Sequence, residues 1–221
     1  SGIYFDSTQP SDLENLISRS EDSQMNERAS LLMSKILDYG ITKYNTPYQP
    51  LPLEQFRDQE NILVVDQTYG DQSICYAFAT DQTFSQMLKQ ALQDYPNAMI
   101  WVKTHPDVQA GFAQTHFRAE DLQHPRIRLC TSAYHPFDLI KQMSHVYVVS
   151  SQMGFEALLC GKKVTCFGVP WYAGWGLTDD RYAKIEHVQG RRGQKRSLAH
   201  IFACAYLRYA RYVSPIHHTR C

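Results

Sequence analysis

Apolar residues recur at helical spacing near the N-terminus, over residues 11–18 and 24–39. Ser11 and Asp12 offer an N-cap for the first helix, and Gly40 is placed to end the second. The proline-rich stretch TPYQPLPLEQF follows, which neither a regular helix nor a central strand accommodates. We therefore divide the chain into an N-terminal helical segment with its linker, residues 1–52, and a compact domain, residues 53–221.

Beyond the linker, short apolar runs alternate with helical patterns. Strands are predicted at 62–66, 98–103, 126–131, 146–150 and 163–167, and helices at 73–94 (with a break near Asp81), 108–117, 136–143, 153–160 and 197–213. Pro136, in the dipeptide His135-Pro136, fits the first position of its helix. Strands that alternate with helices form a parallel sheet covered on both faces. The predicted fold class is α/β, a Rossmann-like parallel sheet with helices on both faces.

The charge and cysteine content of the chain argue against some classes of function. The 22 basic and 22 acidic side chains cancel, which argues against a dedicated nucleic-acid-binding protein. We interpret the basic run RRGQKR, residues 191–196, as a solvated loop, with a phosphate or membrane-surface contact as the alternative. None of the six cysteines forms a CxxC pair, so we interpret them as reduced thiols of a cytosolic protein and expect no zinc site. The sequence shows no signal peptide and no apolar run long enough to span a bilayer.

Polar residues follow the predicted strands at their carboxyl ends, where ligands bind to sheets of this kind. They are Asp66, Gln67, Thr68 and Asp71 after the first strand, Lys103, His105 and Pro106 after the second, Ser150, Ser151, Gln152, Gly154 and Glu156 after the fourth, and Asp179, Asp180 and Arg181 beyond the fifth. Because parallel strands end at one edge of the sheet, this convergence predicts a binding site there.

The segment after the fourth strand suits a nucleotide. Ser150 and Ser151 open a helix whose free N–H groups and dipole can hold a phosphate. Glu156, in the second turn of that helix, can accept hydrogen bonds from a ribose diol. The alternative is an ordinary serine N-cap followed by a surface glutamate.

The roles of the polar residues after the first two predicted strands remain open. His105 precedes Pro106 and is therefore extended, so it can donate to a leaving phosphate, hand it a proton, or be satisfied by backbone groups. Asp66 or Asp71 can act as a nucleophile or base. Asp71 can equally cap the helix that follows Gly70.

Several of these stretches together resemble a known family. VVDQTYGDQSI, KTHPDV, SSQMGFEALLCGKKVTCFG and PWYAGWGLTDDR are similar to the capsule polysaccharide biosynthesis proteins of the KpsC/LipB type. GIYFDSTQPSDLE and GITKYN are similar as well, so the resemblance covers nearly the whole chain. PWYAGWGLTDDR is the most specific string, since the His-Pro and Ser-Ser motifs also occur in sialyltransferase-like enzymes.

The resemblance implies a retaining β-Kdo glycosyltransferase that uses CMP-Kdo and builds the Kdo linker on a lysophosphatidylglycerol anchor for a capsular polysaccharide. It implies a GT-B-like architecture, with residues 53–221 forming the C-terminal, donor-binding half. No metal or other cofactor is expected. The implied partners are CMP-Kdo, lysophosphatidylglycerol or a Kdo-primed glycolipid acceptor, and capsule export or assembly proteins, but no nucleic acid. The implied location is cytoplasmic and peripheral at the inner membrane.

The resemblance also implies roles for residues. Asp66 matches the nucleophile, and Lys103, His105 and Pro106 match a Lys-x-His-Pro motif that meets the donor phosphate and the sugar carboxylate. Ser150 and Ser151 would bind the CMP phosphate, and Glu156 would hold the ribose. The expected donor site also includes Gln67, Thr68, Asp71, Gln152 and Gly154.

The aromatic loop, residues 167–181, would fold over the donor pocket. Trp171, Tyr172 and Trp175 would shield the sugar from water, and Gly174 would let the backbone approach closely. The alternative is that these aromatic rings pack between domains.

Two other functions remain open from the sequence. The family's N-terminal Rossmann-like region, expected before GIYFD, is not part of this sequence. The chain is therefore compatible with a non-catalytic donor-binding or docking fragment of the capsule assembly machinery. A nucleotide-sugar epimerase or hydrolase on the same scaffold is the second alternative.

Overall fold

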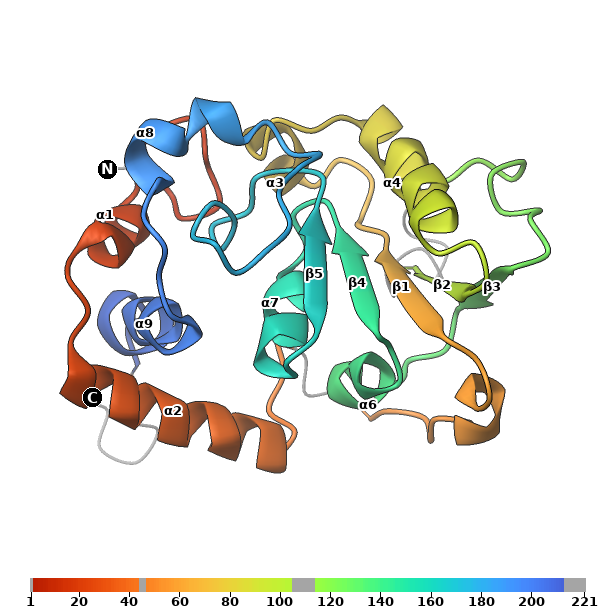
Figure 1. Cartoon of the computed structure of the whole chain (residues 1–221), viewed down its shortest axis with the longest axis horizontal. Coiled ribbons are helices and arrows are strands. Elements are labelled where there is room, and N and C mark those ends of the chain that lie inside the picture. The colour runs from red at the N-terminus through yellow and green to blue at the C-terminus, as the bar shows by residue number, and fades with distance from the viewer. Residues whose placement is uncertain (1, 44–46, 105–113, 213–221) are drawn as a thin grey trace.

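A five-stranded parallel sheet organises the chain in the computed structural model, which describes residues 2–43, 47–104 and 114–212 (Figure 1). The strands are β1 Asn61–Val65, β2 Met99–Lys103, β3 Ile127–Cys130, β4 His145–Val148 and β5 Lys163–Cys166, in the order β3-β2-β1-β4-β5. Each lies within about two residues of its predicted position, and the predicted α/β fold class is confirmed. The central strand, β1, is buried along its whole length, which explains its uninterrupted apolar run.

Helices cover both faces of the sheet. On one face lie α3 (Gln72–Tyr76) and α4 (Asp81–Asp94), and on the other α6 (Pro136–Lys141) and α7 (Gln152–Leu159). The predicted break near Asp81 is confirmed, because a capping box at Thr80 starts α4 there. Pro136 occupies the start of α6 as expected. Most of the helix predicted at 108–117 lies outside the described residues, and residues 114–117 are not helical.

The N-terminal helices pack beside the sheet rather than on it. Helices α1 (Asp12–Ser18) and α2 (Ser23–Asp38) lie against α9 (Leu198–Phe202) and the π-helix η3 (Ala203–Tyr209), at the left of Figure 1. Their buried residues Leu13, Ile17 and Ala29 share one hydrophobic cluster with β1, β4 and β5. The predicted helix at 197–213 is confirmed over residues 198–209, where the α-helix ends at Phe202 and continues as the π-helix η3. The boundary at residue 52 stays a prediction.

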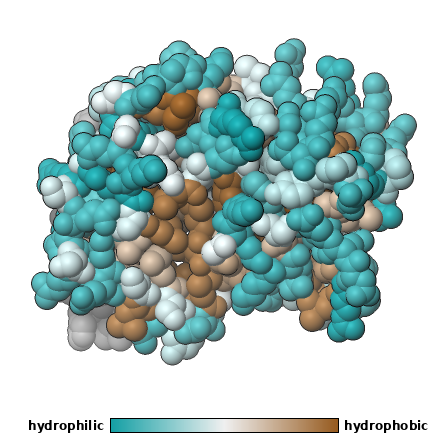
Figure 2. All heavy atoms as spheres, in the orientation of Figure 1, coloured by the Kyte–Doolittle hydropathy of each residue, from teal (hydrophilic) through white to brown (hydrophobic). Residues whose placement is uncertain are grey.

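Three short helices were not predicted, namely η1 (Leu53–Phe56), η2 (Ile185–His187) and α8 (Gln189–Arg192). Figure 2 shows a largely polar face, with apolar residues gathered between the helical layer of α2 and α9 and the sheet. Over the part of the chain that the structure describes, no helix has the length and apolar character needed to cross a bilayer.

Candidate functional site

Asp66 follows the central strand directly, and its carboxylate is buried within a shell of hydrogen-bond donors. Oδ1 accepts from the backbone N–H of Gln67 at 2.9 Å, from His116 Nδ1 at 3.0 Å and from the His116 N–H at 3.4 Å. Oδ2 accepts from Thr115 Oγ1 at 2.6 Å. Donors that are fixed before any ligand binds stabilise a negative charge without reorganisation. The structure thus holds the Asp66 carboxylate in a fixed orientation.

A second network links the ends of β1 and β4. Gln67 Oε1 accepts from the Ser150 N–H at 2.9 Å, and Gln67 Nε2 donates to Ser150 Oγ at 3.0 Å and to Asp71 Oδ2 at 3.2 Å. Asp71 is also the N-cap of α3, where it accepts from the N–H of Ser73. Capping, which the sequence left as one alternative, is therefore what Asp71 does. Gln67 places Asp66 and Ser150 on the same rim.

Helix α7 begins at this rim. Ser151 is its N-cap and accepts from the Met153 N–H at 3.3 Å. Gln152 and Glu156 lie one turn apart on the helix, and both line a cavity of about 430 Å³. Trp171 lines it as well, and its Nε1 donates to Gln152 Oε1 at 3.3 Å. The volume is in the range of small-molecule sites, and three of the predicted donor-binding residues share it.

The remaining lining of this cavity is aromatic and apolar except for Thr42 and Lys43. Its residues are Tyr4, Leu13, Ile36, Ile41, Thr42, Lys43, Phe137, Leu159, Ala205, Tyr206, Tyr209, Ala210 and Tyr212. Neither Asp66 nor Ser150 belongs to this lining. The cavity is therefore adjacent to the carboxylate rim along α7 but does not contain the nucleophile predicted from the resemblance.

Glu156 is a buried acid on the wall of this cavity. Burial raises the pKa of its carboxyl to about 7, although the Lys43 backbone N–H and ammonium act to lower it. Only 7% of the residue is exposed, so the surface position that the sequence left as an alternative is wrong. A carboxyl with this pKa changes charge near neutral pH.

The aromatic loop lies mostly in the core. Tyr172 and Trp175 have only 0% and 1% of their surface exposed, whereas Trp171 reaches the cavity. Gly154, in α7, supports this packing because a Cβ there would lie 2.2 Å from the Tyr172 hydroxyl oxygen. Gly174 adopts a φ of +84°, a conformation that favours glycine. These positions support aromatic packing for Tyr172 and Trp175 and leave Trp171 as the residue that can meet a ligand.

The basic run does not form a solvated loop throughout. Arg192 has 2% of its surface exposed, and its Nε donates to Glu14 Oε2 at 2.6 Å. Its other N–H groups reach Ser7 Oγ and the carbonyls of Pro170 and Ala173. The interpretation from charge alone was wrong here, because composition does not show that an acidic partner lies far away in sequence.

The other predicted residues fall in three groups. Lys103 ends β2, and burial lowers the pKa of its ammonium, which donates to the Thr104 carbonyl at 3.0 Å. Thr68 lies on the rim and accepts from the Asp71 N–H through its carbonyl. His105 and Pro106 lie outside the described residues.

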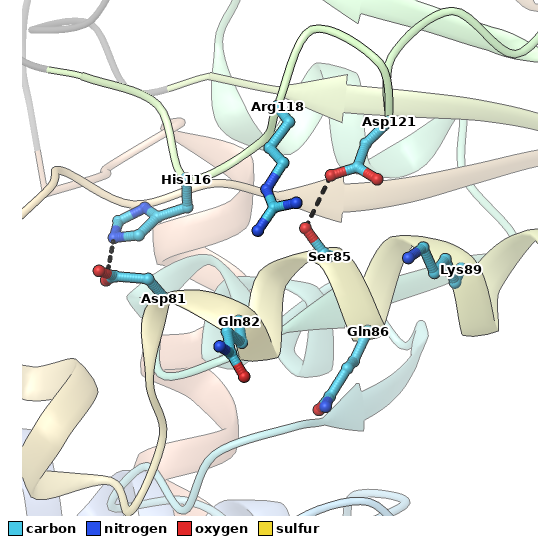
Figure 3. A pocket seen from close by; sticks show the side chains of 8 residues that line it. All are labelled: Asp81, Gln82, Ser85, Gln86, Lys89, His116, Arg118 and Asp121. Carbon is cyan, nitrogen blue, oxygen red and sulfur yellow. Dashed lines mark hydrogen bonds and ion pairs between the residues drawn. The ribbon is translucent and has the colours of Figure 1, made fainter.

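Sequence reasoning missed Thr115 and His116, although both bind Asp66. His116 also lines a second cavity of about 290 Å³ with Asp81, Ser85 and Arg118 (Figure 3). A Thr-His pair next to an apolar Phe117 was the only signal, and no periodic pattern marked it. Among the residues that the structure describes, no group of three or more His, Cys, Asp or Glu side chains could hold a metal ion.

Comparison with known proteins identifies the family. The model of the capsule polysaccharide biosynthesis protein family matches residues 23–212. The chain belongs to this family. The resemblance inferred from the motifs is therefore confirmed.

Relatives of the chain include two curated proteins. The capsule polysaccharide modification protein LipA of Neisseria meningitidis serogroup B is 44% identical over 220 residues, which are 97% of this chain and 31% of LipA. The lipopolysaccharide-processing protein LpsZ of Rhizobium meliloti is 39% identical over 219 residues, 96% of this chain and 48% of LpsZ. The chain thus spans less than half the length of these relatives.

Two solved structures from Thermosulfurimonas dismutans are similar over the whole chain. The KpsC β-Kdo 2,4 transferase has a TM-score of 0.89 at 39% identity, and this chain covers 67% of it. The KpsC β-Kdo 2,7 transferase has a TM-score of 0.76 at 34% identity, with 66% covered. The predicted resemblance to half of a GT-B glycosyltransferase is confirmed by these matches.

Proposed function

We propose that this chain forms the donor-binding half of a retaining β-Kdo transferase that uses CMP-Kdo in capsule polysaccharide biosynthesis. The observation that carries the proposal is the rim at the carboxyl ends of β1 and β4. There Gln67 joins an anion held by fixed donors, Asp66, to the serines that open α7. The similarity to two Kdo transferases supports the choice of sugar.

Each part of CMP-Kdo has a chemically suited group near this rim. The start of α7, with Ser150 and Ser151, offers N–H and hydroxyl donors to the phosphate. Gln152, Glu156 and Trp171 line the adjacent cavity, where the carboxylate of Glu156 can accept from ribose hydroxyls and Trp171 can stack on an apolar ring face. We assign the nucleoside to this cavity.

The chemistry proceeds in two displacements at the anomeric carbon of Kdo. An Asp66 carboxylate oxygen forms a bond to that carbon as the bond to the phosphate oxygen breaks, and CMP leaves with the electron pair. The acceptor hydroxyl then forms its bond to the same carbon, Asp66 leaves as a carboxylate, and the hydroxyl proton passes to a base on the acceptor side. Two inversions give net retention.

The acceptor and linkage are part of the proposal. We infer a 2,4 linkage rather than a 2,7 linkage, because the similarity to the 2,4 transferase is greater in both TM-score and identity. A glycolipid acceptor built on lysophosphatidylglycerol would place the protein at the cytoplasmic side of the inner membrane. NMR of the product from CMP-Kdo and a Kdo-primed acceptor would identify the linkage, and a 2,7 product would contradict this inference.

Replacement of Asp66 tests the reaction type. Asp66→Ala should lower the transfer rate by about 10⁴-fold or more, since loss of a nucleophile removes the covalent route. CMP affinity, measured by calorimetry, should change little because Asp66 lies outside the nucleoside cavity. Transfer at the wild-type rate, or loss of CMP binding in this variant, would contradict the nucleophile assignment. A wild-type protein that binds CMP but forms no glycoside would favour the docking or epimerase alternatives.

A further inference from the structure

His116 is held rigidly against Asp66. Neither side chain has accessible surface, and Nδ1 lies 3.0 Å from Asp66 Oδ1. The imidazole ring stacks on Phe84, with ring centroids 4.0 Å apart and planes 12° apart, and Tyr69 lies on it at 5.4 Å. An ionised carboxylate only accepts hydrogen bonds, so the proton of this pair is on Nδ1. The ring stack therefore fixes the direction of a donor aimed at Asp66.

The donors are distributed unequally over the two carboxylate oxygens. Oδ1 accepts from three N–H groups, two of them from His116. Among residues 2–43, 47–104 and 114–212, Oδ2 accepts from Thr115 Oγ1 alone. A carboxylate oxygen offers about two lone pairs, so Oδ2 keeps one without a donor among the described residues, and this is the lone pair that the proposed attack would use.

Packing alone does not explain the choice of histidine at position 116. Nε2 is buried and has no hydrogen-bond partner within the described part of the chain. The nearest acid is Asp81, whose Oδ1 lies 3.5 Å away as an ion-pair contact (Figure 3). A buried polar atom without a hydrogen bond is unfavourable. A purely apolar side chain would fill the same space without that cost, so the use of His116 lies in its Nδ1 donor.

We propose that His116 is a positioning residue for the transfer reaction: it saturates Oδ1 of Asp66 and so orients Oδ2 as the oxygen that attacks the anomeric carbon. This inference rests on the proposed function, in which Asp66 is the nucleophile. His116 acts through Asp66 and need not touch the sugar. Its loss should therefore slow formation of the covalent adduct and leave donor binding intact.

Two substitutions separate the Nδ1 donor from the bulk of the ring. In His116→Asn the side-chain amide nitrogen takes the place of Nδ1 and can still donate to Asp66. In His116→Gln the amide nitrogen is displaced toward the place of Nε2, so that donor is lost from Oδ1. Both variants remove the stacked ring, which makes each the control for the other.

The experiment measures single-turnover formation of the Kdo–Asp66 adduct from CMP-Kdo by mass spectrometry, together with KM and calorimetric CMP affinity. His116→Gln should lower the adduct rate by about 100-fold, as for other single donors to a reacting charge. His116→Asn should recover about tenfold or more of that loss. KM and CMP affinity should stay close to the wild-type values in both.

Three outcomes would decide against the inference or against its premise. An adduct rate in His116→Gln equal to that of the wild type would overturn the positioning role. Equal losses in the two variants, with CMP binding intact, would show that the ring rather than Nδ1 matters and would overturn it too. If instead the wild type forms no adduct and Asp66→Ala transfers Kdo normally, the proposed function fails and not the His116 inference alone.

Discussion

Two buried carboxylates in this protein are surrounded by donors in different ways. Glu14 accepts from Arg191 Nε and Arg192 Nε, each at 2.6 Å, so that guanidinium groups neutralise it. Asp66 accepts from backbone N–H groups, a hydroxyl and an imidazole instead. At Glu14 each carboxylate oxygen has a guanidinium partner. At Asp66, Oδ2 accepts a single hydrogen bond within the described part of the chain.

The difference fits the roles that we propose for the two sites. At Glu14 the remaining Arg192 donors are used on Ser7, Pro170 and Ala173, which ties α1 and the aromatic loop together. At Asp66 the neighbouring His116 has an Nε2 that lies beside a cavity and that no described residue hydrogen-bonds. A closed network of this kind stabilises the fold, whereas an incompletely satisfied one marks a place where a ligand or a reaction completes it.

The largest stability effect is expected at Glu14. Glu14→Gln should lower the free energy of unfolding by about 3–5 kcal/mol, because two guanidinium groups lose their shared anion in a buried site. Urea unfolding would measure it. Asp12→Asn is the matched control, since Asp12 lies on the same helix but is exposed. A loss for Asp66→Ala as large as that for Glu14→Gln would break the contrast between the two sites.

A third buried acid, Glu156, differs from Glu14 and Asp66 in its expected effect on the pH dependence of stability. Its pKa is about 7 in the folded protein against the usual 4.5, mainly because of burial. Between these values the folded state binds more protons than the unfolded state, so stability falls as pH rises from 4.5 through 7. The total change is about 3 kcal/mol.

Unfolding free energies measured between pH 4.5 and pH 8 would test this expectation. Glu156→Gln should remove this part of the pH dependence, since glutamine does not titrate. Parallel curves for the variant and the wild type would show that burial does not raise the pKa of Glu156. The same carboxylate should bind ribose hydroxyls better above pH 7, where it is ionised.

A smaller effect is expected at the contact between α7 and the aromatic loop. Gly154→Ala forces a Cβ to within 2.2 Å of the Tyr172 hydroxyl, which donates to the Ser151 carbonyl. The variant should lose about 1–3 kcal/mol of stability through overpacking. Gly190→Ala is the control, because a Cβ there meets nothing within 4 Å. Equal stability of the two variants would show that packing against Tyr172 does not require glycine at position 154.

The sequence predicted the sheet and its rim well because both depend on local patterns. The apolar run 62–66 is buried on both sides in β1, and a threonine before Asp81 caps α4 where the pattern breaks. The polar residues at the ends of β1 and β4 meet through Gln67, since parallel strands end at one edge.

The sequence could not predict partners that are far apart along the chain. His116 and Asp66 are 50 positions apart, and nothing local marks the histidine as a donor to that carboxylate. Arg192 and Glu14 are 178 positions apart, so the basic run looked like solvated charge. The π-helix after Phe202 packs against α1 and α2, which are far away in sequence, and no local pattern marks the change of helix type.

The contact between Glu14 and Arg192 has a consequence for synthesis on the ribosome. Helix α1 emerges before α8, and Glu14 meets Arg192 only after 178 further positions have been translated. Until then the apolar side of α1 has no packing partner, since α9 and η3 are synthesised later still. Helix α1 is thus made well before the elements that it packs against, and its apolar side needs protection until they have been synthesised.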